Sequence, residues 1–198
     1  QCLIGVTEKN RMKRVDFMNR MAFEKAIFDI QRGKQVMVFV HSRKDTGKTA
    51  QALIELAQKL SFSHLFENHE HEHFTLWKRA VDKSRSVEVQ QLFHKGFGVH
   101  HAGMLRSDRT LTEQMFESGV IKVLCCTSTL AWGVNLPAHT VIIKGTELYD
   151  PERGGFVDIS VLDVLQIFGR AGRPQYDNSG QAVLITPHAS LNKYVGLL

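Results

Sequence analysis

The stretch Gln35-Val36-Met37-Val38-Phe39-Val40 decides the fold. It is a continuous apolar run of strand length, which is typical of a strand covered by helices on both faces. Helical patterns flank it at residues 16–31, which Gly33 closes, and at residues 45–60. The sequence therefore predicts a helix, a buried strand and a second helix in succession.

The rest of the chain continues this alternation. We expect a short strand ending in a turn over residues 97–104, strands at residues 121–126, 140–144 and 181–185, and helices at residues 77–93, 107–118 and 161–168. Residues 145–160 carry Tyr149-Asp150-Pro151 and Arg153-Gly154-Gly155-Phe156, a turn-rich pattern that indicates a hairpin. We predict an α/β fold, with a mostly parallel sheet covered by helices on both faces and an inserted β-hairpin.

Length and composition fit one globular domain over residues 1–198. Residues 1–14 are polar and basic and show no clear period, so we expect the chain to be a fragment of a larger protein. The net charge of +5 and the basic clusters at residues 9–20 and 78–85 are compatible with nucleic-acid binding. No apolar run approaches the roughly 18 residues of a membrane span, so we expect no membrane partner. Cys125 and Cys126 are neighbours in a predicted strand, and we interpret them as reduced core residues on opposite faces.

Two local patterns are weak candidates for sites. Thr46-Gly47-Lys48-Thr49 resembles the end of a phosphate-binding loop, but Ser42 stands where that motif needs glycine, so we interpret Thr46 or Asp45 as a helix N-cap. Residues 61–74 are dense in histidine and glutamate, and a strand would align His69, His71 and His73, whereas a helix would align only His69 and His73. A zinc site and a solvated insertion both explain this segment, and since no cysteine pair accompanies it we predict no metal site.

Polar residues follow three of the predicted strands. They are His41-Ser42-Arg43, His100-His101-Ala102-Gly103 and Thr127-Ser128-Thr129. Because the carboxyl ends of parallel strands meet at one edge of a sheet, we expect these segments to lie side by side. Hydroxyls, imidazoles, guanidinium groups and backbone N–H groups bind a phosphate backbone without reading bases. Each segment taken alone is equally explained as an ordinary cap or turn.

The stretch Gln166-Ile167-Phe168-Gly169-Arg170-Ala171-Gly172-Arg173 follows an apolar helical pattern. Residues three apart share a helix face, so Arg170 and Arg173 are expected to point at one target. Arginine carries a fixed charge and a planar fork of donors that suits phosphate oxygens. We therefore predict that this pair binds the phosphates of a nucleotide; an ordinary helix end is the alternative.

Taken together, residues 38–43, 100–103, 127–137 and 166–173 resemble motif IV, the following His-Ala-Gly element, motif V and motif VI of superfamily-two helicases. The amino-acid sequences of residues 129–138, 143–146 and 166–177 are similar to those of the large tandem-cassette helicases. That family includes the spliceosomal snRNA-unwinding helicase and the helicase subunit of the activating signal cointegrator complex. The resemblance implies that the chain is the second RecA-like domain of such a helicase.

The resemblance implies a role for each matching residue. Arg170 and Arg173 would reach the γ-phosphate of ATP held on the first RecA-like domain, and Gln166, Gly133 and Asn135 would line that nucleotide. The residues implied to contact the nucleic-acid strand are Ser42, Arg43, His101 and Thr127, with Tyr149 and Phe156 as stacking residues on the hairpin. The hairpin would split the duplex; a purely structural loop is the alternative.

The chain lacks both a phosphate-binding loop and an Asp-Glu-x-His box. ATP and Mg²⁺ would therefore bind mainly through the missing first domain, and we expect this domain alone to be inactive. The resemblance implies the second motor domain of an ATP-dependent 3′-to-5′ RNA or DNA helicase. A cassette that has lost its motor and serves as a protein-interaction scaffold is the alternative. The implied partners are an RNA or DNA strand, the first RecA-like domain and other subunits of a complex, in the nucleus or also the cytoplasm.

Overall fold

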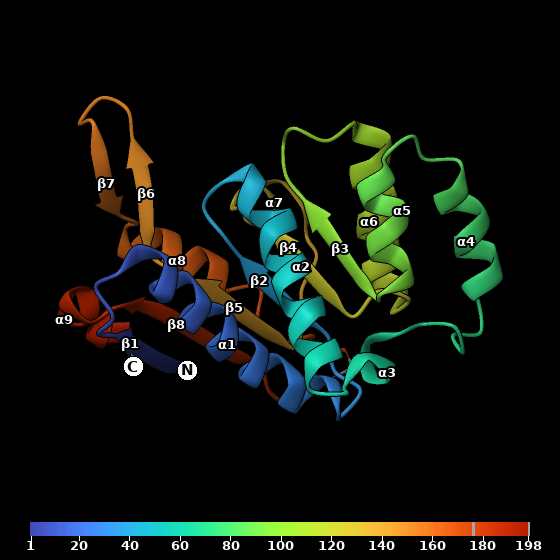
Figure 1. The fold of residues 1–198 in the computed structure, drawn as a ribbon, viewed down its shortest axis with the longest axis horizontal. Coiled ribbons are helices and arrows are strands. Elements are labelled where there is room, and N and C mark those ends of the chain that lie inside the picture. Colours follow the sequence, from blue (N-terminus) through green and yellow to red (C-terminus); the bar gives the residue numbers. More distant parts are fainter. Residues whose placement is uncertain (176, 198) are drawn as a thin grey trace.

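A computed structural model describes residues 1–175 and 177–197; Tyr176, which belongs to the quoted run 166–177, lies outside the described residues. Its centre is a six-stranded sheet in the order β1-β8-β5-β2-β4-β3, and every neighbouring pair is parallel (Figure 1). The strands are β1 (Cys2–Val6), β2 (Val36–Phe39), β3 (Phe97–His100), β4 (Val123–Cys126), β5 (Thr140–Lys144) and β8 (Gln181–Pro187). The predicted α/β fold with a parallel sheet is confirmed.

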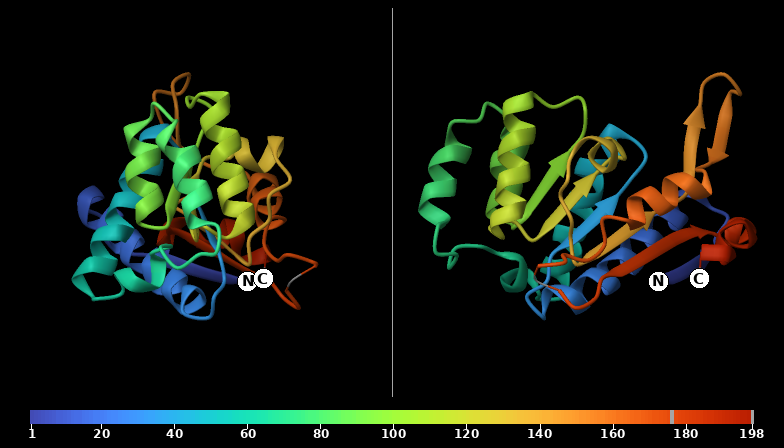
Figure 2. Two further views of the ribbon diagram at one scale, coloured as in Figure 1. Left: turned by 90° about the vertical axis from the view of Figure 1, so that its right-hand side faces the viewer. Right: turned by 180° about the vertical axis from the view of Figure 1, so that it is seen from behind.

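Helices cover both faces of the sheet. One face carries α1 (Arg11–Ile30), α2 (Arg43–Lys59) and α3 (Ser63–Phe66). The other carries α4 (Phe74–Asp82), α6 (Arg106–Ser118), α7 (Thr129–Gly133) and α8 (Val161–Phe168), while α5 (Val87–His94) contributes to both cores at the β3 edge. Seen from behind in Figure 2, α8 crosses the face opposite α1. The sheet is therefore buried on both sides, as a parallel sheet requires.

Alternation along the central strands divides the core into two. Val36 and Val38 pack beneath α1 and α2, whereas Met37 and Phe39 pack on the other face, and all four are fully buried. The same alternation sends neighbouring Cys125 and Cys126 to opposite cores, as predicted. A continuous apolar run is thus needed because neither face meets water.

The inserted hairpin is present and stands apart from the sheet. It consists of β6 (Glu147–Asp150) and β7 (Gly155–Asp158), which pair in antiparallel register. In Figure 1 it projects beyond the sheet, above the end of the molecule where both termini lie. The short C-terminal elements η1 (His188–Ser190), α9 (Leu191–Tyr194) and η2 (Val195–Leu197) lie at that end.

Helix boundaries differ from the prediction where capping and pairing decide them. The N-cap of α2 is Ser42, whose Oγ accepts a hydrogen bond from Asp45 N at 3.2 Å, and not Thr46 or Asp45. Thr46 is inside the helix and its hydroxyl donates to Arg43 O at 2.6 Å. The expected helix at residues 77–93 is two helices, α4 and α5, because Ser86 caps a new start.

The first strand was not predicted. β1 pairs with β8, Cys2 opposite Val183, so its partner lies at the far end of the sequence. The first helix also begins earlier than expected, at Arg11, after the N-cap Asn10. The apolar run Cys2-Leu3-Ile4-Gly5-Val6 was a visible signal of strand length, but it was overlooked because the polar and basic residues that follow it dominate residues 1–14.

The histidine-rich segment does not form the strand that would align its three imidazoles. His71 Nε2 lies 3.1 Å from Ser118 O, whereas His73 Nε2 lies 3.3 Å from the neighbouring Glu72 carboxylate, so these side chains face different partners. Within residues 1–175 and 177–197, no group of three or more histidine, cysteine or acidic residues is arranged to hold a metal ion. In the same ranges no helix combines the length and the apolar character that a bilayer crossing requires.

Candidate nucleotide and nucleic-acid interface

The polar segments that follow β2, β3 and β4 lie side by side. Val40 N donates to Cys126 O at 2.9 Å, and Thr127 N donates to His100 O at 3.1 Å. These bonds continue the ladder of three neighbouring strands past their carboxyl ends. We call Ser42, Arg43, His101 and Thr127 the strand-end surface.

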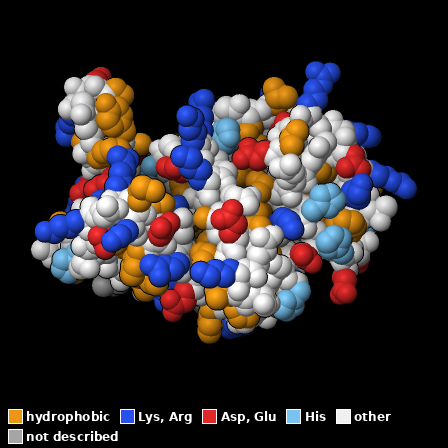
Figure 3. All heavy atoms as spheres, viewed as in Figure 1, with side chains coloured by type: hydrophobic (Ala, Val, Ile, Leu, Met, Phe, Trp, Pro, Cys, Tyr) orange, Lys and Arg blue, Asp and Glu red, His pale blue; other side chains and the backbone are white. Residues whose placement is uncertain are grey.

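The strand-end surface combines a helix start with positive charge. Ser42 and Arg43 are exposed at the beginning of α2, where unpaired backbone N–H groups favour an anion. Arg43 lies against Gly103, because a Cβ at Gly103 would be 3.2 Å from the Arg43 side chain. A side chain there would push Arg43 away. Figure 3 shows Lys and Arg side chains above α2, between the hairpin and β3.

His101 presents a donor to this surface. Gly103 N donates to His101 Nδ1 at 3.1 Å, so Nδ1 is the acceptor nitrogen and Nε2 carries the proton of the neutral ring. Burial lowers the pKa of His101, and Arg43, His100 and Arg109 lower it further. The imidazole therefore stays neutral at pH 7 and offers one N–H without adding charge.

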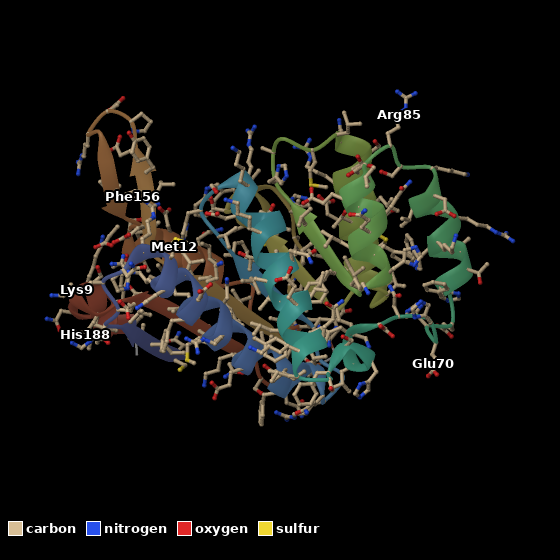
Figure 4. All side chains as sticks on the ribbon, in the orientation of Figure 1. Lys9, Met12, Glu70, Arg85, Phe156 and His188 are labelled. Atoms are coloured by element: carbon tan, nitrogen blue, oxygen red, sulfur yellow. The ribbon has the colours of Figure 1, made fainter. Side chains whose placement is uncertain are left out.

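The hairpin carries an exposed aromatic pair. Tyr149 and Phe156 are 54% and 47% exposed, and their rings meet edge to face with centroids 5.5 Å apart. The guanidinium of Arg11, at the start of α1, lies 4.3 Å from the Phe156 centroid. Figure 4 shows Phe156 on the hairpin above α1, near Met12. Aromatic rings with a cation above them can stack on nucleobases.

Buried hydrogen bonds fix the base of the hairpin. His41 Nε2 donates to Gly145 O, Ile159 N donates to Thr146 O at 2.7 Å, and Tyr194 OH donates to Ile159 O at 2.7 Å. A cavity of about 310 Å³ opens beside this base, between α1 and the hairpin. Its polar lining includes Arg11, Arg14, His41, Asp45, Lys144 and Glu147. The hairpin therefore stands on a rigid support next to a charged hollow.

Four of the predicted nucleotide residues lie between α7 and α8. Arg170 Nη1 lies 3.4 Å from Asn135 Oδ1, and its Nη2 donates to Ala131 O. Gly133 ends α7 with open space where a Cβ would be, and Gln166 is exposed on α8. The structure thus brings Arg170 and Asn135 together, while Gln166 and Gly133 lie exposed on α8 and at the end of α7.

Arg173 does not share a helix face with Arg170. Helix α8 ends at Phe168, so both arginines lie beyond it. Arg170 O accepts from Ala138 N at 3.0 Å, and Gly172 N donates to Ala138 O at 2.6 Å. Gly172 has φ of +87°, a left-handed conformation that turns the chain before Arg173. The prediction that three-residue spacing aligns the two side chains is wrong, because the helix has already ended.

Arg173 is held by its own set of acceptors. Its Nε lies 3.0 Å from Asp177 Oδ2 and its Nη1 lies 3.0 Å from Gln35 Oε1. Burial alone would raise the pKa of Asp177, but hydrogen bonds from Arg173 and Lys34 hold that pKa well below its usual range. The Arg173 side chain remains 22% exposed. Sequence reasoning missed Asp177 and Gln35: an acid four residues after Arg173 was a visible signal, whereas Gln35 gave none.

The donors around α7 and α8 fit an anionic nucleotide. Guanidinium groups, an exposed amide and open space at a glycine are what phosphate oxygens and a ribose can approach. This site faces solvent from one side of the domain, so a nucleotide there would need a second surface to hold it.

Comparison with known proteins agrees with this arrangement. The family described as "Helicase conserved C-terminal domain" matches residues 65–175. The chain belongs to the helicase C-terminal domain family. The RecA-like fold and the resemblance to superfamily-two helicases are therefore confirmed.

Relatives of this helicase C-terminal domain match it from end to end. It is 55% identical over 198 residues to "DExH-box ATP-dependent RNA helicase DExH14" of Arabidopsis thaliana. It is 48% identical to "Activating signal cointegrator 1 complex subunit 3" of Homo sapiens and 49% identical to "U5 small nuclear ribonucleoprotein 200 kDa helicase" of Drosophila melanogaster, each over 198 residues. All of this chain is covered, but it spans only 9% of the length of these three relatives.

Proposed function

We propose that this domain is the second motor domain of an ATP-dependent 3′-to-5′ helicase, most directly one that acts on RNA. The observation that carries the proposal is the pairing of two surfaces in one small domain. The strand-end surface offers phosphate-binding groups, and after α7 and α8 Arg170 meets Asn135, with Gln166 exposed on α8. Two relatives that are named as helicases support the same proposal.

In this proposal Arg170 and Arg173 act on ATP that is anchored to the first RecA-like domain. Charge develops on the transferred phosphoryl group, and guanidinium groups stabilise it when the two domains close. ATP and Mg²⁺ would be held mainly by the other domain. The present chain supplies Gln166, Gly133 and Asn135 along the nucleotide, and it does not hydrolyse ATP alone.

The grip on nucleic acid would come from the opposite end of the sheet. The strand-end surface contacts the sugar-phosphate backbone, and such contacts carry no base information. The hairpin would separate strands, with Tyr149 or Phe156 stacking on an end base pair. Each cycle of closure then shifts the gripped strand against the first domain. In this proposal the full protein works within a larger complex in the nucleus, and the names of two relatives, a subunit of the activating signal cointegrator 1 complex and a helicase of the U5 small nuclear ribonucleoprotein, support it.

Arg173→Ala in the full-length protein tests the proposal. We expect ATP binding to persist while nucleic-acid-stimulated hydrolysis falls about 10³- to 10⁵-fold, because such arginines contribute mainly in the transition state. Near-normal turnover would overturn the catalytic assignment. If the unmutated full-length protein shows no nucleic-acid-stimulated hydrolysis, the motor proposal gives way to the scaffold alternative.

A further inference from the structure

A buried polar chain runs behind Arg173, at the amino ends of β2 and β5. It begins with Asp29 in α1, continues through His139 just before β5, and ends at Asp177. His139 Nε2 lies 3.8 Å from Asp29 Oδ1, and His139 Nδ1 lies 3.5 Å from Asp177 Oδ2. The two carboxylate side chains are each 1% exposed. Buried carboxylates need compensating partners, and here these are Thr140 Oγ1, which donates to Asp29 Oδ2 at 2.6 Å, and Lys34 and Arg173, which donate to Asp177. His139 packs between the two carboxylates, and its Nδ1 makes no hydrogen bond within the described residues.

Asp177 is the member of the chain that contacts Arg173. It accepts hydrogen bonds from Arg173 N at 3.2 Å, from Nε at 3.0 Å and from Nη2 at 3.5 Å. Lys34 Nζ adds a bond of 2.9 Å from the other side. A side-on carboxylate that binds both the guanidinium and the backbone of one arginine fixes the plane of that guanidinium.

Gln35 fixes the opposite side of the guanidinium. Its Nε2 donates to Phe116 O at 2.6 Å and to Ile121 O at 2.9 Å. Carbonyl oxygens only accept hydrogen bonds, so Gln35 Nε2 must face them and Gln35 Oε1 must face Arg173. There Oε1 accepts a hydrogen bond from Arg173 Nη1 at 3.0 Å. Gln35 is 6% exposed, so its amide has no room to turn over. Arg173 therefore sits between two acceptors that are themselves immobilised.

We propose that Asp177 is a positioning residue for ATP hydrolysis: held in place by Lys34, it sets the orientation in which Arg173 meets the nucleotide. This inference rests on the proposed function. Its competitor is a purely structural ion cluster, which would stabilise the fold without any special relation to Arg173. Supporting groups of this kind typically change activity about 10- to 100-fold while they leave substrate binding nearly intact.

The test is a double-mutant cycle in the full-length protein, with nucleic-acid-stimulated hydrolysis measured as kcat and KM for ATP. We expect Asp177→Asn to lower kcat about 10- to 100-fold while KM changes less than about threefold. In an Arg173→Ala background the same substitution should lower kcat less than about twofold, because its effect passes through Arg173. Asp108→Asn is the matched control, since Asp108 is also a buried carboxylate but pairs with Ser84 Oγ at 2.7 Å, away from this site.

The outcomes separate the two proposals. Arg173→Ala with near-normal turnover overturns the proposed function and this inference together. Loss of turnover in Arg173→Ala, combined with an equal effect of Asp177→Asn in both backgrounds, overturns only the positioning role. If Asp177→Asn lowers the yield of folded protein, the same cycle with Lys34→Met decides, because Lys34 Nζ donates to Asp177 Oδ1 at 2.9 Å. A loss that disappears in the Arg173→Ala background then supports the positioning role, and an equal loss in both overturns it.

Discussion

Gly180→Ala should displace the segment that carries both arginines. A Cβ at Gly180 would lie 2.5 Å from Gly172 N and 2.7 Å from both Ala171 C and Gly172 Cα. All three neighbours are backbone atoms, so no side-chain rotation relieves the clash. The backbone must separate by about 1 Å to reach ordinary van der Waals contact. Gly172 N also donates to Ala138 O, and a shift of that size weakens this bond.

The expected cost follows from these contacts. Over-packing a tight site destabilises by about 1–3 kcal/mol, and weakening one hydrogen bond adds about 1 kcal/mol. The effect on the rate of hydrolysis should be easier to detect than the loss of stability, because displacing a catalytic group by about 1 Å lowers the rate about 10²-fold. We therefore expect Gly180→Ala to lower kcat of the full-length protein by one to two orders of magnitude while the fold persists.

Hydrogen exchange and steady-state hydrolysis measure the two effects separately. Exchange should accelerate at Gly172 and along residues 181–187, and kcat should fall with little change in nucleic-acid binding. Gly196→Ala is the matched control, since among residues 1–175 and 177–197 a Cβ there meets no atom within 4 Å and the residue takes no part in the site. If Gly180→Ala keeps the kcat and the exchange pattern of the parent protein, the close approach does not position the arginines and the reasoning fails.

Three further predictions concern other parts of the domain. Burial lowers the pKa of His41, so as the pH falls the unfolded state takes up a proton before the folded state does, and the free energy of unfolding should fall by at most about 1.4 kcal/mol per pH unit below pH 6.5. Urea unfolding at pH 7.5 and 5.5 should show a smaller pH dependence for His41→Asn. An unchanged pH dependence in that variant would contradict this prediction. Phe156→Ala should slow strand separation severalfold in an unwinding assay, because stacking contributes about 1–3 kcal/mol per base, while nucleic-acid-stimulated hydrolysis stays within about twofold. Equal losses in both assays would argue against a strand-separating role of the hairpin. Burial raises the pKa of Cys125 to about 12 and that of Cys126 well above its usual value, so neither thiol should react with iodoacetamide at pH 8 until the protein is denatured. Rapid labelling of either in the native state would refute this.

Local sequence determined the elements that are buried on all sides. The runs at β2, β4 and β5 were recognisable because a strand covered on both faces admits only apolar residues along its length. The bounds of β5 matched its predicted range for the same reason. Those of α8 matched because a polar N-cap, Ser160, and Gly169 flank its apolar run, and the turn residues of the hairpin marked its place. Parallel order then followed from the alternation of strands and helices.

Only the tertiary structure decided what surrounds the two arginines. Spacing suggested one shared face, but the helix ends at Phe168, and Arg170 and Arg173 each meet different acceptors. The chain of Asp29, His139 and Asp177 joins three segments that no local pattern connects. The hydrophobic periodicity of a sequence indicates which side chains face water and which face the core, because the free energy of burial depends on the area removed from water. It does not indicate which buried polar groups bond to one another, since those partners come together only when the sheet and its helices assemble.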